Sequence, residues 1–380
     1  MREWSAARIG DVAECLDAIR KPVRAADRRD GPYPYYGASG VIDHVDHYLF
    51  EGTFALVAED GENLRSRNTP VSFLATGKFW VNNHAHILSG TDRCDVRFLS
   101  YAIENSDMSG YLTGSTQPKL TQQSLLSMRF HWPPIAEQRA IAEVLGALDD
   151  KIEANRCVIG AANAVLDAIF WAHAVDSEST TASEVVDPIL GGTPSRANPD
   201  YWSGSIPWAS AKDVAAASDG VLLGTAESIS ERGLAESPAK LVGEGVSIIT
   251  ARGTVGRLVR TALPSTSFNQ TCYALVPRGD LPPLLLYLGM KRALDRLSGL
   301  THGTIFSTIT KQTFDVLPIN LPADDEWRRL SAQLESTDRL VIALLVENER
   351  LTRIRDALLP KLMSGELRVR DAERLVEDAV

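Results

Sequence analysis

The stretch WPPIAEQRAIAEVLGALDDKIEANR, residues 132–156, decides the fold because it joins a rigid start to a long helical pattern. The two prolines hold an extended segment, and from Ile141 onwards apolar side chains recur at alternating steps of four and three residues. This is the heptad spacing of a helix that packs along a second helix. We therefore expect a long helix here, with one narrow apolar seam.

The pattern belongs to an internal repeat with a fixed offset of 189 residues. GSTQPKLTQQSLLSMRFHWPPIAEQ begins at Gly114, and GTIFSTITKQTFDVLPINLPADDEW begins at Gly303; at the same offset Asp149 corresponds to Asp338. Because a repeat sets the architecture of a chain, we expect a domain followed by a helix, twice over. The predicted segments are a first domain at 1–133, a first spacer helix at 134–176, a second domain at 177–321, a second spacer helix at 322–372 and a tail at 373–380.

Each predicted helix needs a partner for its apolar seam, and the most economical arrangement packs the two helices on each other, antiparallel. In the alternative arrangement, each helix packs separately on its own domain. Asn155 and Asn348 fall on the seam, where a buried Asn could fix the register, although both could equally be exposed. The seam residues expected to be buried are Ile141, Leu145, Leu148, Ile152, Ile159, Leu166, Leu334, Val341, Leu344, Leu351 and Leu358.

Both predicted domains show the patterns of strands mixed with short helices. YLFEGTFALVAEDG (48–61) and GEGVSIITARGTVGRLVRTAL (243–263) alternate apolar and polar residues between turn-forming residues. Short helices are expected at 96–105 and 283–297, without the regular alternation of a parallel βαβ series. The predicted fold class is α+β: two similar domains, each followed by a long helix, with the helices packed as an antiparallel coiled coil with internal pseudo-two-fold symmetry.

The acidity of the chain is concentrated in the predicted helices. The net charge is −10, yet the two domains are close to neutral, while residues 134–178 carry 3 Lys and Arg against 8 Asp and Glu. Global charge therefore neither supports nor excludes a nucleic-acid partner. The four widely spaced cysteines indicate neither disulfides nor a zinc site, the N-terminus lacks a signal-peptide pattern, and the apolar runs are shorter than a membrane span. A cytoplasmic protein is expected.

Signatures of catalysis and of metal binding are weak in this sequence. There is no GxxxxGK[ST] phosphate loop, and WPPI at Trp132 lacks both the leading amide or acid and the aromatic residue of the amino-methyltransferase motif. His44, His47, His84 and His86 form the one metal-like grouping, and polarity of a surface or groove explains them more simply. We predict no metal site and no catalytic residue.

Residues 132–156 resemble the conserved helical region of the specificity (S) subunits of type I restriction–modification systems. YPYYGASGVID, NNHAHIL and GSTQPKLT are similar to pieces of the first target-recognition domain of that family, and GGTPSRANPDYWSGSIPWASAKD, ARGTVG, SFNQTCYAL and RDALLPKLMSGEL to pieces of its second half. The resemblance covers nearly the whole chain in the family's order. Trp132 replaces a small apolar residue, without expected effect, and Trp327 replaces the Gln of the family's Pro-Pro-x-x-Glu-Gln form, so the second helix is expected to start differently.

The resemblance implies a non-catalytic, DNA-reading subunit of a larger complex. Each domain would read one half of a bipartite site in double-stranded DNA, about one helical turn or ~34 Å apart. The helices would set the non-specific gap between the two half-sites and would dock two methylation subunits. Restriction and translocation subunits would complete the system. S-adenosylmethionine and ATP would bind these partners rather than this chain. The residues expected to contact DNA are Tyr35, Tyr36, Arg65, Arg67, Lys78, Asn82, Asn83, Ser115, Gln117, Lys119, Trp208, Lys212, Arg252, Thr254, Asn269, Gln270, Thr304, Ser307 and Lys311.

Two other functions stay open from the sequence. A stand-alone DNA-modifying enzyme with an unfamiliar site predicts S-adenosylmethionine binding or DNA cleavage by the purified chain. A coiled-coil scaffold that does not bind DNA predicts no sequence-selective retention of DNA. For each residue proposed to contact DNA, the simpler interpretation is a solvated loop residue or a hydrogen bond that closes the fold.

Overall fold

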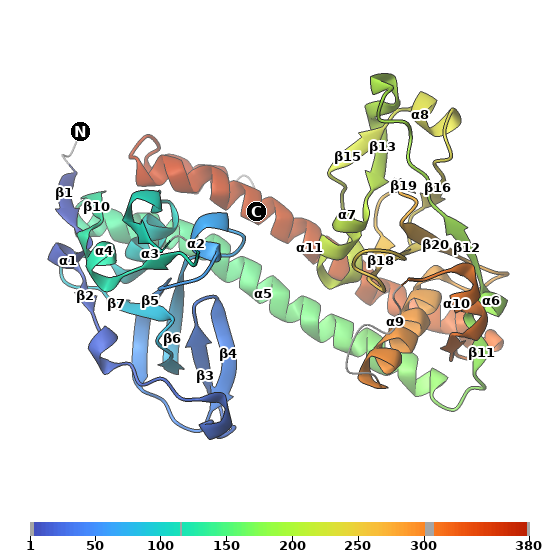
Figure 1. Ribbon diagram of the computed structural model, residues 1–380, viewed down its shortest axis with the longest axis horizontal. Helices are drawn as coiled ribbons and strands as arrows, with labels where there is room; N and C mark the ends of the chain where they lie inside the picture. The colour runs from blue at the N-terminus through green and yellow to red at the C-terminus, as the bar shows by residue number, and fades with distance from the viewer. Residues whose placement is uncertain (1–3, 115, 301–307, 378–380) are drawn as a thin grey trace. The chain divides into compact units, whose positions relative to one another are not determined.

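The structure is a computed structural model that describes residues 4–114, 116–300 and 308–377, and at 298–300 it describes the backbone alone. Two long helices, α5 (Ile135–Ala174) and α11 (Trp327–Met363), run through two compact units. Unit 1 comprises Met1–Ile152 with Arg350–Val380, and unit 2 comprises Glu153–Glu349. Each unit therefore holds one mixed domain and a segment of each long helix (Figure 1).

The domain of unit 1 is built on a six-stranded sheet in the order β2-β7-β5-β6-β3-β4, antiparallel except between β3 and β6. The elements of this sheet and the helix packed on it are β2 (Glu14–Cys15), β7 (Ala85–Ser89), β5 (Phe50–Ala58), β6 (Ser72–Val81), β3 (Tyr33–Gly37), β4 (Gly40–Val45) and α3 (Val96–Glu104). Alternate residues of β5 face opposite sides, because Val57 joins the core that contains α3 and Leu56 joins an aromatic cluster on the other face. Asp95 starts α3, since its side chain accepts hydrogen bonds from the amides of Arg97 and Phe98, both at 3.0 Å.

Shorter elements surround this sheet and join it to α5. They are β1 (Ser5–Arg8), α1 (Ile9–Val12), η1 (Asp17–Ile19), η2 (Ala25–Asp27), α2 (Asn63–Ser66), η3 (Ser109–Tyr111), β8 (Leu112–Thr113), β9 (Lys119–Leu120), α4 (Gln122–Ser127), β10 (Arg129–Trp132) and α12 (Val369–Glu377).

The domain of unit 2 divides its strands between two sheets, β12-β20-β17-β18-β14 and β15-β13-β19-β16. The strands are β12 (Val186–Leu190), β20 (Cys272–Pro277), β17 (Ser247–Thr250), β18 (Leu258–Thr261), β14 (Val221–Leu222), β15 (Glu227–Ile229), β13 (Trp202–Ala209), β19 (Ser265–Phe268) and β16 (Leu241–Gly243). The helix α9 (Pro283–Leu300) packs on the five-stranded sheet, and its Leu285 and Met290 share a core with Ile249 of β17 and with Leu330 and Leu334 of α11. The remaining elements are β11 (Thr180–Thr181), α6 (Ala182–Val185), η4 (Pro199–Tyr201), α7 (Ala211–Ala216), η5 (Ser218–Gly220), α8 (Glu231–Ala235), α10 (Lys311–Val316), β21 (Pro318–Ile319) and η6 (Asp324–Glu326).

The predicted repeat is visible where each domain joins its long helix. In unit 1 the strand β10 pairs antiparallel with β1, and in unit 2 the strand β21 pairs antiparallel with β11. The helices α4 and α10 begin at Gln122 and Lys311, which are 189 residues apart, and end at the same offset. The two junctions therefore share one backbone plan, and the predicted α+β class with two similar domains is confirmed.

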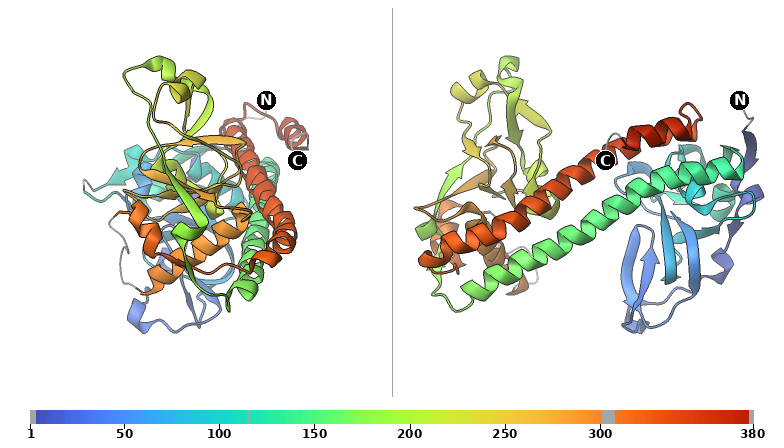
Figure 2. Two further views of the ribbon diagram at one scale, coloured as in Figure 1. Left: turned by 90° about the vertical axis from the view of Figure 1, so that its right-hand side faces the viewer. Right: turned by 180° about the vertical axis from the view of Figure 1, so that it is seen from behind.

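The long helices pack antiparallel in both units (Figure 2). In unit 1, Arg355 of α11 donates to Asp149 of α5 at 2.8 Å. In unit 2, Asn155 donates to Asn348 at 2.9 Å, and His173 lies 3.3 Å from Glu326, so rising numbers on α5 meet falling numbers on α11. The predicted antiparallel pair is confirmed, and its two seam asparagines hydrogen-bond to each other, with the Asn155 side chain buried.

The seam residues also pack on the domains, so the two arrangements considered for the helices coexist. Leu145 and Leu148 belong to the core of the first domain, while Ile159 and Val341 form a cluster between the two helices in unit 2. Leu344 is half-buried on that seam. The buried seam residues are Ile141, Leu145, Leu148, Ile152, Ile159, Leu166, Leu334, Val341, Leu351 and Leu358.

The two long helices begin differently, as the Trp327 replacement predicts. Gln138 donates to the carbonyl of Pro133 at 2.9 Å, and Trp327, at the 189-residue offset, donates through its indole to the carbonyl of Pro322 at 2.8 Å. Gln138 also holds the loop before α3 through Arg93 and Asp95, at 3.0 Å each. Trp327 thus reproduces one of the three bonds, and the 3₁₀ turn η6 precedes α11.

Helix α5 is more apolar than predicted, because the apolar runs in the sequence are each shorter than a membrane span. By length and composition alone this helix could cross a membrane, a criterion that core helices of globular proteins also meet. Leu166, Phe170 and Ala174 are buried in the core of unit 2 with Leu330 and Leu334 of α11. These contacts bury the last turns of α5 in the core of unit 2.

Candidate nucleic-acid interface

Three loops meet at the strand ends of unit 1. The amide of Glu59, just after β5, donates to the carbonyl of His84 at 2.8 Å, and the carbonyl of Glu59 accepts from the amide of Leu120 at 2.8 Å. The amide of Gly61 donates to the carbonyl of Pro118 at 3.1 Å. The loop cluster of unit 1 is defined here as residues 59–62, 82–84 and 114–119, of which 115 lies outside the described residues.

Equivalent backbone atoms assemble three loops in unit 2. The amide of Ala251, just after β17, donates to the carbonyl of Thr271 at 2.7 Å, and its carbonyl accepts from the amide of Ile309 at 3.0 Å. Leu120 and Ile309 are 189 residues apart, so the repeat extends into these loops. The loop cluster of unit 2 is defined as residues 251–257, 269–271 and 308–311. It brings together Arg252, Thr254, Asn269, Gln270 and Lys311, all predicted to contact DNA.

The middle loop of each cluster is a tight turn with an Asn at its start. The side-chain oxygens of Asn82 and Asn269 accept from the amide two residues further on, at 2.8 and 3.1 Å. These two side chains therefore close the turns, as Asx motifs do, which is the simpler of their two interpretations. The next residues, Asn83 and Gln270, are exposed at the turn tips, and the Gln270 side chain accepts a short hydrogen bond from the Thr193 hydroxyl.

Basic groups of the first cluster are paired with carboxylates. Glu59 binds Arg20 at 2.7 Å and Lys119 at 3.1 Å, and Asp60 lies 2.8 Å from His84. Burial would raise the pKa of Glu59, but the hydrogen bonds from Arg20 and Lys119 hold it below its usual value. The Lys119 side chain remains 49% exposed, so its ammonium group already has a partner yet stays accessible.

A buried histidine lies behind this loop cluster. The two ring nitrogens of His86 face Asp17 at 2.5 Å and the carbonyl of Leu120 at 2.8 Å. Burial would raise the pKa of Asp17, but His86, the Ile87 amide and Arg20 lower it. Because the Leu120 carbonyl can only accept, the Nε2 of His86 donates to it, and the Nδ1 faces the Asp17 carboxyl group.

Asp17 and His86, together with Glu59, form a group of side chains among the described residues that could hold a metal ion. Asp17, Glu59 and His86 have ligand atoms within 4.8 Å of one another. Arg20, however, pairs with Asp17 at 3.2 Å and with Glu59 at 2.7 Å, and both His86 nitrogens are already used. We interpret the group as an ion-pair network whose donors and acceptors are satisfied by one another.

Basic groups of the second cluster are placed differently. Arg252, Arg257 and Lys311 are exposed, and no residue in the described part of the chain forms an ion pair with their side chains. The segment 251–257 contains no acidic residue. Its charge is therefore available to an anionic partner.

Two aromatic residues predicted to contact DNA lie inside the domains instead. Tyr35 is fully buried, with its hydroxyl 3.1 Å from the Val23 amide, and Trp208 is buried, with its indole donating to the Gly192 carbonyl at 3.0 Å. Tyr36 is half-buried between Phe73 and Phe79. The structure thus removes Tyr35 and Trp208 from the candidate surface, because their polar ends close hydrogen bonds within the fold.

The remaining candidates divide between fold-closing and exposed groups. Arg67 donates to the carbonyls of Glu104 and Ser106 at 2.9 and 2.6 Å, and Arg65 donates to that of Gly114 at 2.9 Å, so both arginines order loops. Lys78, on β6, lies over the ring of Tyr48 and outside the loop cluster. The exposed candidates are Gln117, Lys212 and Thr254, and those outside the described residues are Ser115, Thr304 and Ser307.

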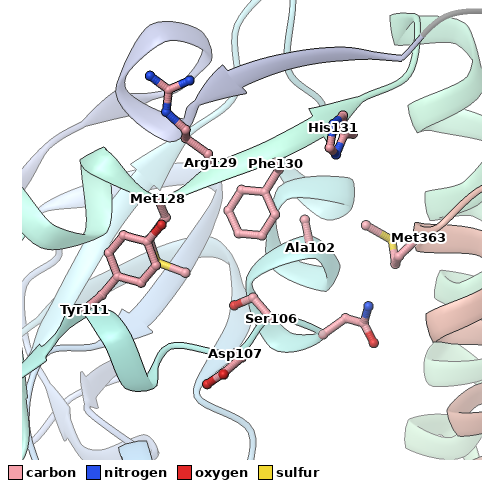
Figure 3. A pocket seen from close by; sticks show the side chains of 10 residues that line it. Ala102, Ser106, Asp107, Tyr111, Met128, Arg129, Phe130, His131 and Met363 are labelled. Atoms are coloured by element: carbon pink, nitrogen blue, oxygen red, sulfur yellow. The ribbon is translucent and has the colours of Figure 1, made fainter.

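A cavity of about 340 Å³ in unit 1 is a weaker candidate site (Figure 3). The Phe130 ring is one of the side chains that line it, and the Arg129 guanidinium points away from that ring (Figure 3). The Ser106 hydroxyl donates to the Ile103 carbonyl at 2.7 Å, and Asp107 accepts from the Ser109 amide at 2.9 Å. These polar groups are bonded locally and do not converge on the cavity, as a cofactor site requires.

Sequence reasoning missed Arg20, Asp17 and Glu59, which set the charge of the first cluster, and Arg257 in the second. Arg257 directly follows the quoted ARGTVG motif, so its position was a usable signal. Arg20 and Glu59 are 39 residues apart, and no local pattern links them.

Two α+β domains, two antiparallel long helices and two equivalent loop clusters define the class of fold to which this chain belongs. The family model of the type I restriction modification DNA specificity domain matches residues 1–159 and 175–352, and the chain belongs to this family.

Curated relatives are similar to parts of this chain, and a solved structure shares its fold. The chain is 37% identical to a Haemophilus influenzae type I restriction enzyme specificity subunit over 146 residues, which is 38% of this chain and 37% of the relative. It is 26% identical to the HindI specificity subunit of the same organism over 196 residues, or 50% of this chain and 41% of that protein, so it spans about two fifths of the length of these relatives. The type I restriction–modification S subunit of M. genitalium has the same fold, with a TM-score of 0.64 at 15% identity over 94% of this chain and 96% of that chain.

Proposed function

We propose that this chain is the non-catalytic specificity subunit of a cytoplasmic type I restriction–modification complex. Each unit would contact one half of a bipartite site in double-stranded DNA through its loop cluster. The observation that carries the proposal is the equivalence of the two clusters, which the same backbone bonds assemble on either side of the 189-residue repeat. Methylation and restriction subunits would supply S-adenosylmethionine and ATP chemistry.

The long helices offer a surface for the methylation subunits. In unit 2, Val158 and Val165 of α5 are 45% and 47% exposed, and Leu340 and Val346 of α11 are 45% and 48% exposed. Apolar side chains at this spacing favour the packing of further helices. We expect Val158→Glu/Leu340→Glu to abolish co-purification with the methylation subunit, while Val175→Glu, an equally exposed valine just beyond α5, should preserve it. Equal loss in both variants would argue against this surface.

The main test combines target mapping with a change in helix length. The chain is co-expressed with the methylation subunit, and methylated adenines are mapped genome-wide. Seven residues are then inserted between Ile152 and Glu153 and between Glu349 and Arg350, which keeps the heptad seam. Seven helical residues add about 10.5 Å, so the gap in the target should lengthen by about three base pairs. Altered half-sites, or an unchanged gap, would contradict the proposed role of the helices.

Two alternatives make different predictions for the same material. Cleavage of DNA or binding of S-adenosylmethionine by the purified chain would favour a stand-alone enzyme. A methylated motif without two fixed halves would argue against a bipartite specificity subunit. A lack of sequence-selective DNA retention would favour a coiled-coil scaffold that does not bind DNA.

A further inference from the structure

The hairpin that joins β17 to β18 is held rigidly at its base. The buried Thr250 hydroxyl donates to the carbonyl of Thr254 and accepts from the amide of Arg257 at 3.0 Å. The amide of Gly256 donates to the carbonyl of Thr250 at 2.9 Å. One buried side chain therefore ties both arms of the loop, so the hairpin needs little ordering when a partner binds.

The tip of this hairpin presents donors that the described residues do not use. The Arg252 and Arg257 side chains are exposed, and none of the described residues pairs with either guanidinium. The amides of Gly253 and Thr254 likewise make no hydrogen bond within the described part of the chain. Gly253 has φ +78°, and the space beside its Cα is open. Two guanidinium groups beside free amides are the donors that phosphate oxygens prefer.

The equivalent loop of unit 1 has the opposite charge. Glu59 and Ala251 make the same backbone bonds, and the residues that follow them are Asp60, Gly61 and Glu62 in unit 1 but Arg252, Gly253 and Thr254 in unit 2. The basic groups near the acidic loop are paired with it, as Lys119 is with Glu59 at 3.1 Å. A phosphate at the first loop would meet carboxylates, whereas at the second it would meet free cations.

We propose that the 251–257 hairpin is a DNA-backbone site that binds phosphate, and that unit 2 supplies most of the salt-dependent affinity of the chain. Unit 1 then contacts its half-site mainly through neutral donors such as Asn83 and Gln117, which are exposed. This inference rests on the proposed DNA-reading function and adds a division of roles between the two units.

The test measures the affinity of the full-length chain for a random-sequence duplex as a function of salt concentration. Each phosphate contact contributes about 0.9 to the slope of log affinity against log salt. Arg252→Ala/Arg257→Ala should therefore lower the slope by about two and weaken binding at least tenfold at about 0.1 M salt. Arg252→Lys/Arg257→Lys keeps the charge and should retain most of the slope, which separates loss of charge from misfolding.

Arg328→Ala provides the matched control. Arg328 is exposed in the same unit but lines a separate cavity with Trp327, and its removal should change the slope by much less than one. An unchanged slope in the alanine double variant, or an equal fall in the control, would overturn the inference while leaving the proposed function standing. Failure of the wild-type chain to bind duplex DNA would instead overturn the proposed function, and this inference with it.

Discussion

The two loop clusters share one backbone frame and differ in charge. The backbone amides of Glu59 and Ala251 each donate to the middle loop of their cluster, and their carbonyls each accept from the amide of the residue before a helix N-cap. Glu59, however, is an acid within an ion-pair network, whereas Ala251 lies in the loop that carries Arg252 and Arg257, which are unpaired among the described residues. The frame depends on amide and carbonyl groups that every residue except proline carries. Side-chain charge is therefore free to differ between units without disturbing the loops, and each unit can contact its half-site by different means.

The repeat places an aspartate on each long helix, Asp149 on α5 and Asp338 on α11, and the two units use it differently. Asp338 pairs with Arg260 at 2.5 Å, and the Arg260 side chain is 3% exposed. Asp149 accepts from Tyr101 at 2.5 Å and from Arg355 at 2.8 Å, with its side chain 34% exposed. The same position thus fixes a helix to its domain by a buried ion pair in unit 2 and by a more hydrated network in unit 1.

Removing these two aspartates should give the largest difference between the units. Asp338→Ala leaves the guanidinium of Arg260 buried without its carboxylate, which should lower the free energy of unfolding by about 3–5 kcal/mol. Asp149→Ala exposes its former partners to water and should cost about 1–2 kcal/mol. Urea denaturation of both variants measures the two losses.

A double variant provides the control for this comparison. Arg260→Met/Asp338→Leu removes both charges, so it should recover much of the stability lost in Asp338→Ala. Equal losses from the two single aspartate variants would show that burial does not distinguish the two anchors.

The acid sensitivity of unit 1 should be the next largest effect. Asp17 and Glu59 have pKa values lowered in the folded chain, despite burial, by His86 and Arg20 and, for Glu59, by Lys119. The folded state therefore binds fewer protons than the unfolded state in acid. The stabilisation is complete above the ordinary pKa values of about 3.9 for Asp and 4.3 for Glu and is lost as the pH falls through the lower folded values.

Hydrogen exchange of the β5 amides reports on unit 1 and can follow this loss. Their protection should fall below about pH 4, and Asp17→Asn/Glu59→Gln should show a weaker dependence on pH in that window. The β17 amides of unit 2 serve as the internal reference. A pH dependence that survives in the double variant would assign the acid sensitivity to other carboxyl groups.

A change at Glu59 can make the first loop cluster resemble the second. Glu59→Gln removes the carboxylate that holds Lys119 and should free this ammonium group for DNA. We expect the salt slope for duplex binding to rise by about one and the affinity to rise roughly tenfold at 0.1 M salt. In a Lys119→Ala background the same change should leave the slope unaltered. A gain that persists there would come from the lost negative charge alone rather than from the freed lysine.

The sequence predicted the helices, the repeat and the α+β class because each depends on periodic or repeated patterns. The apolar seams of both long helices, with Ile141 on α5 and Leu358 on α11, follow heptad spacing. This spacing can be recognised whichever apolar residue stands at each position. The burial of Tyr35 and Trp208 was not predictable, since an aromatic residue in a strand has the same local pattern on either face. The pairing of Glu59 with Lys119 was missed because it joins residues 60 positions apart. Local sequence therefore located the candidate loops but not the charge that they leave available.

The smallest expected effects come from two lysines predicted to contact DNA, one in each unit. Lys119 and Lys311 are 192 residues apart, so the repeat does not superimpose them: Lys119 lies on β9 beside Glu59, and Lys311 begins α10 with no ion-pair partner among the described residues. Lys311→Ala should lower the salt slope of duplex binding by about one, whereas Lys119→Ala should lower it by less than about half that amount. Titrations of both variants at several salt concentrations measure the difference. Two unchanged slopes would remove both lysines from the phosphate contacts, and a larger fall for Lys119→Ala would show that its pairing with Glu59 opens when DNA binds.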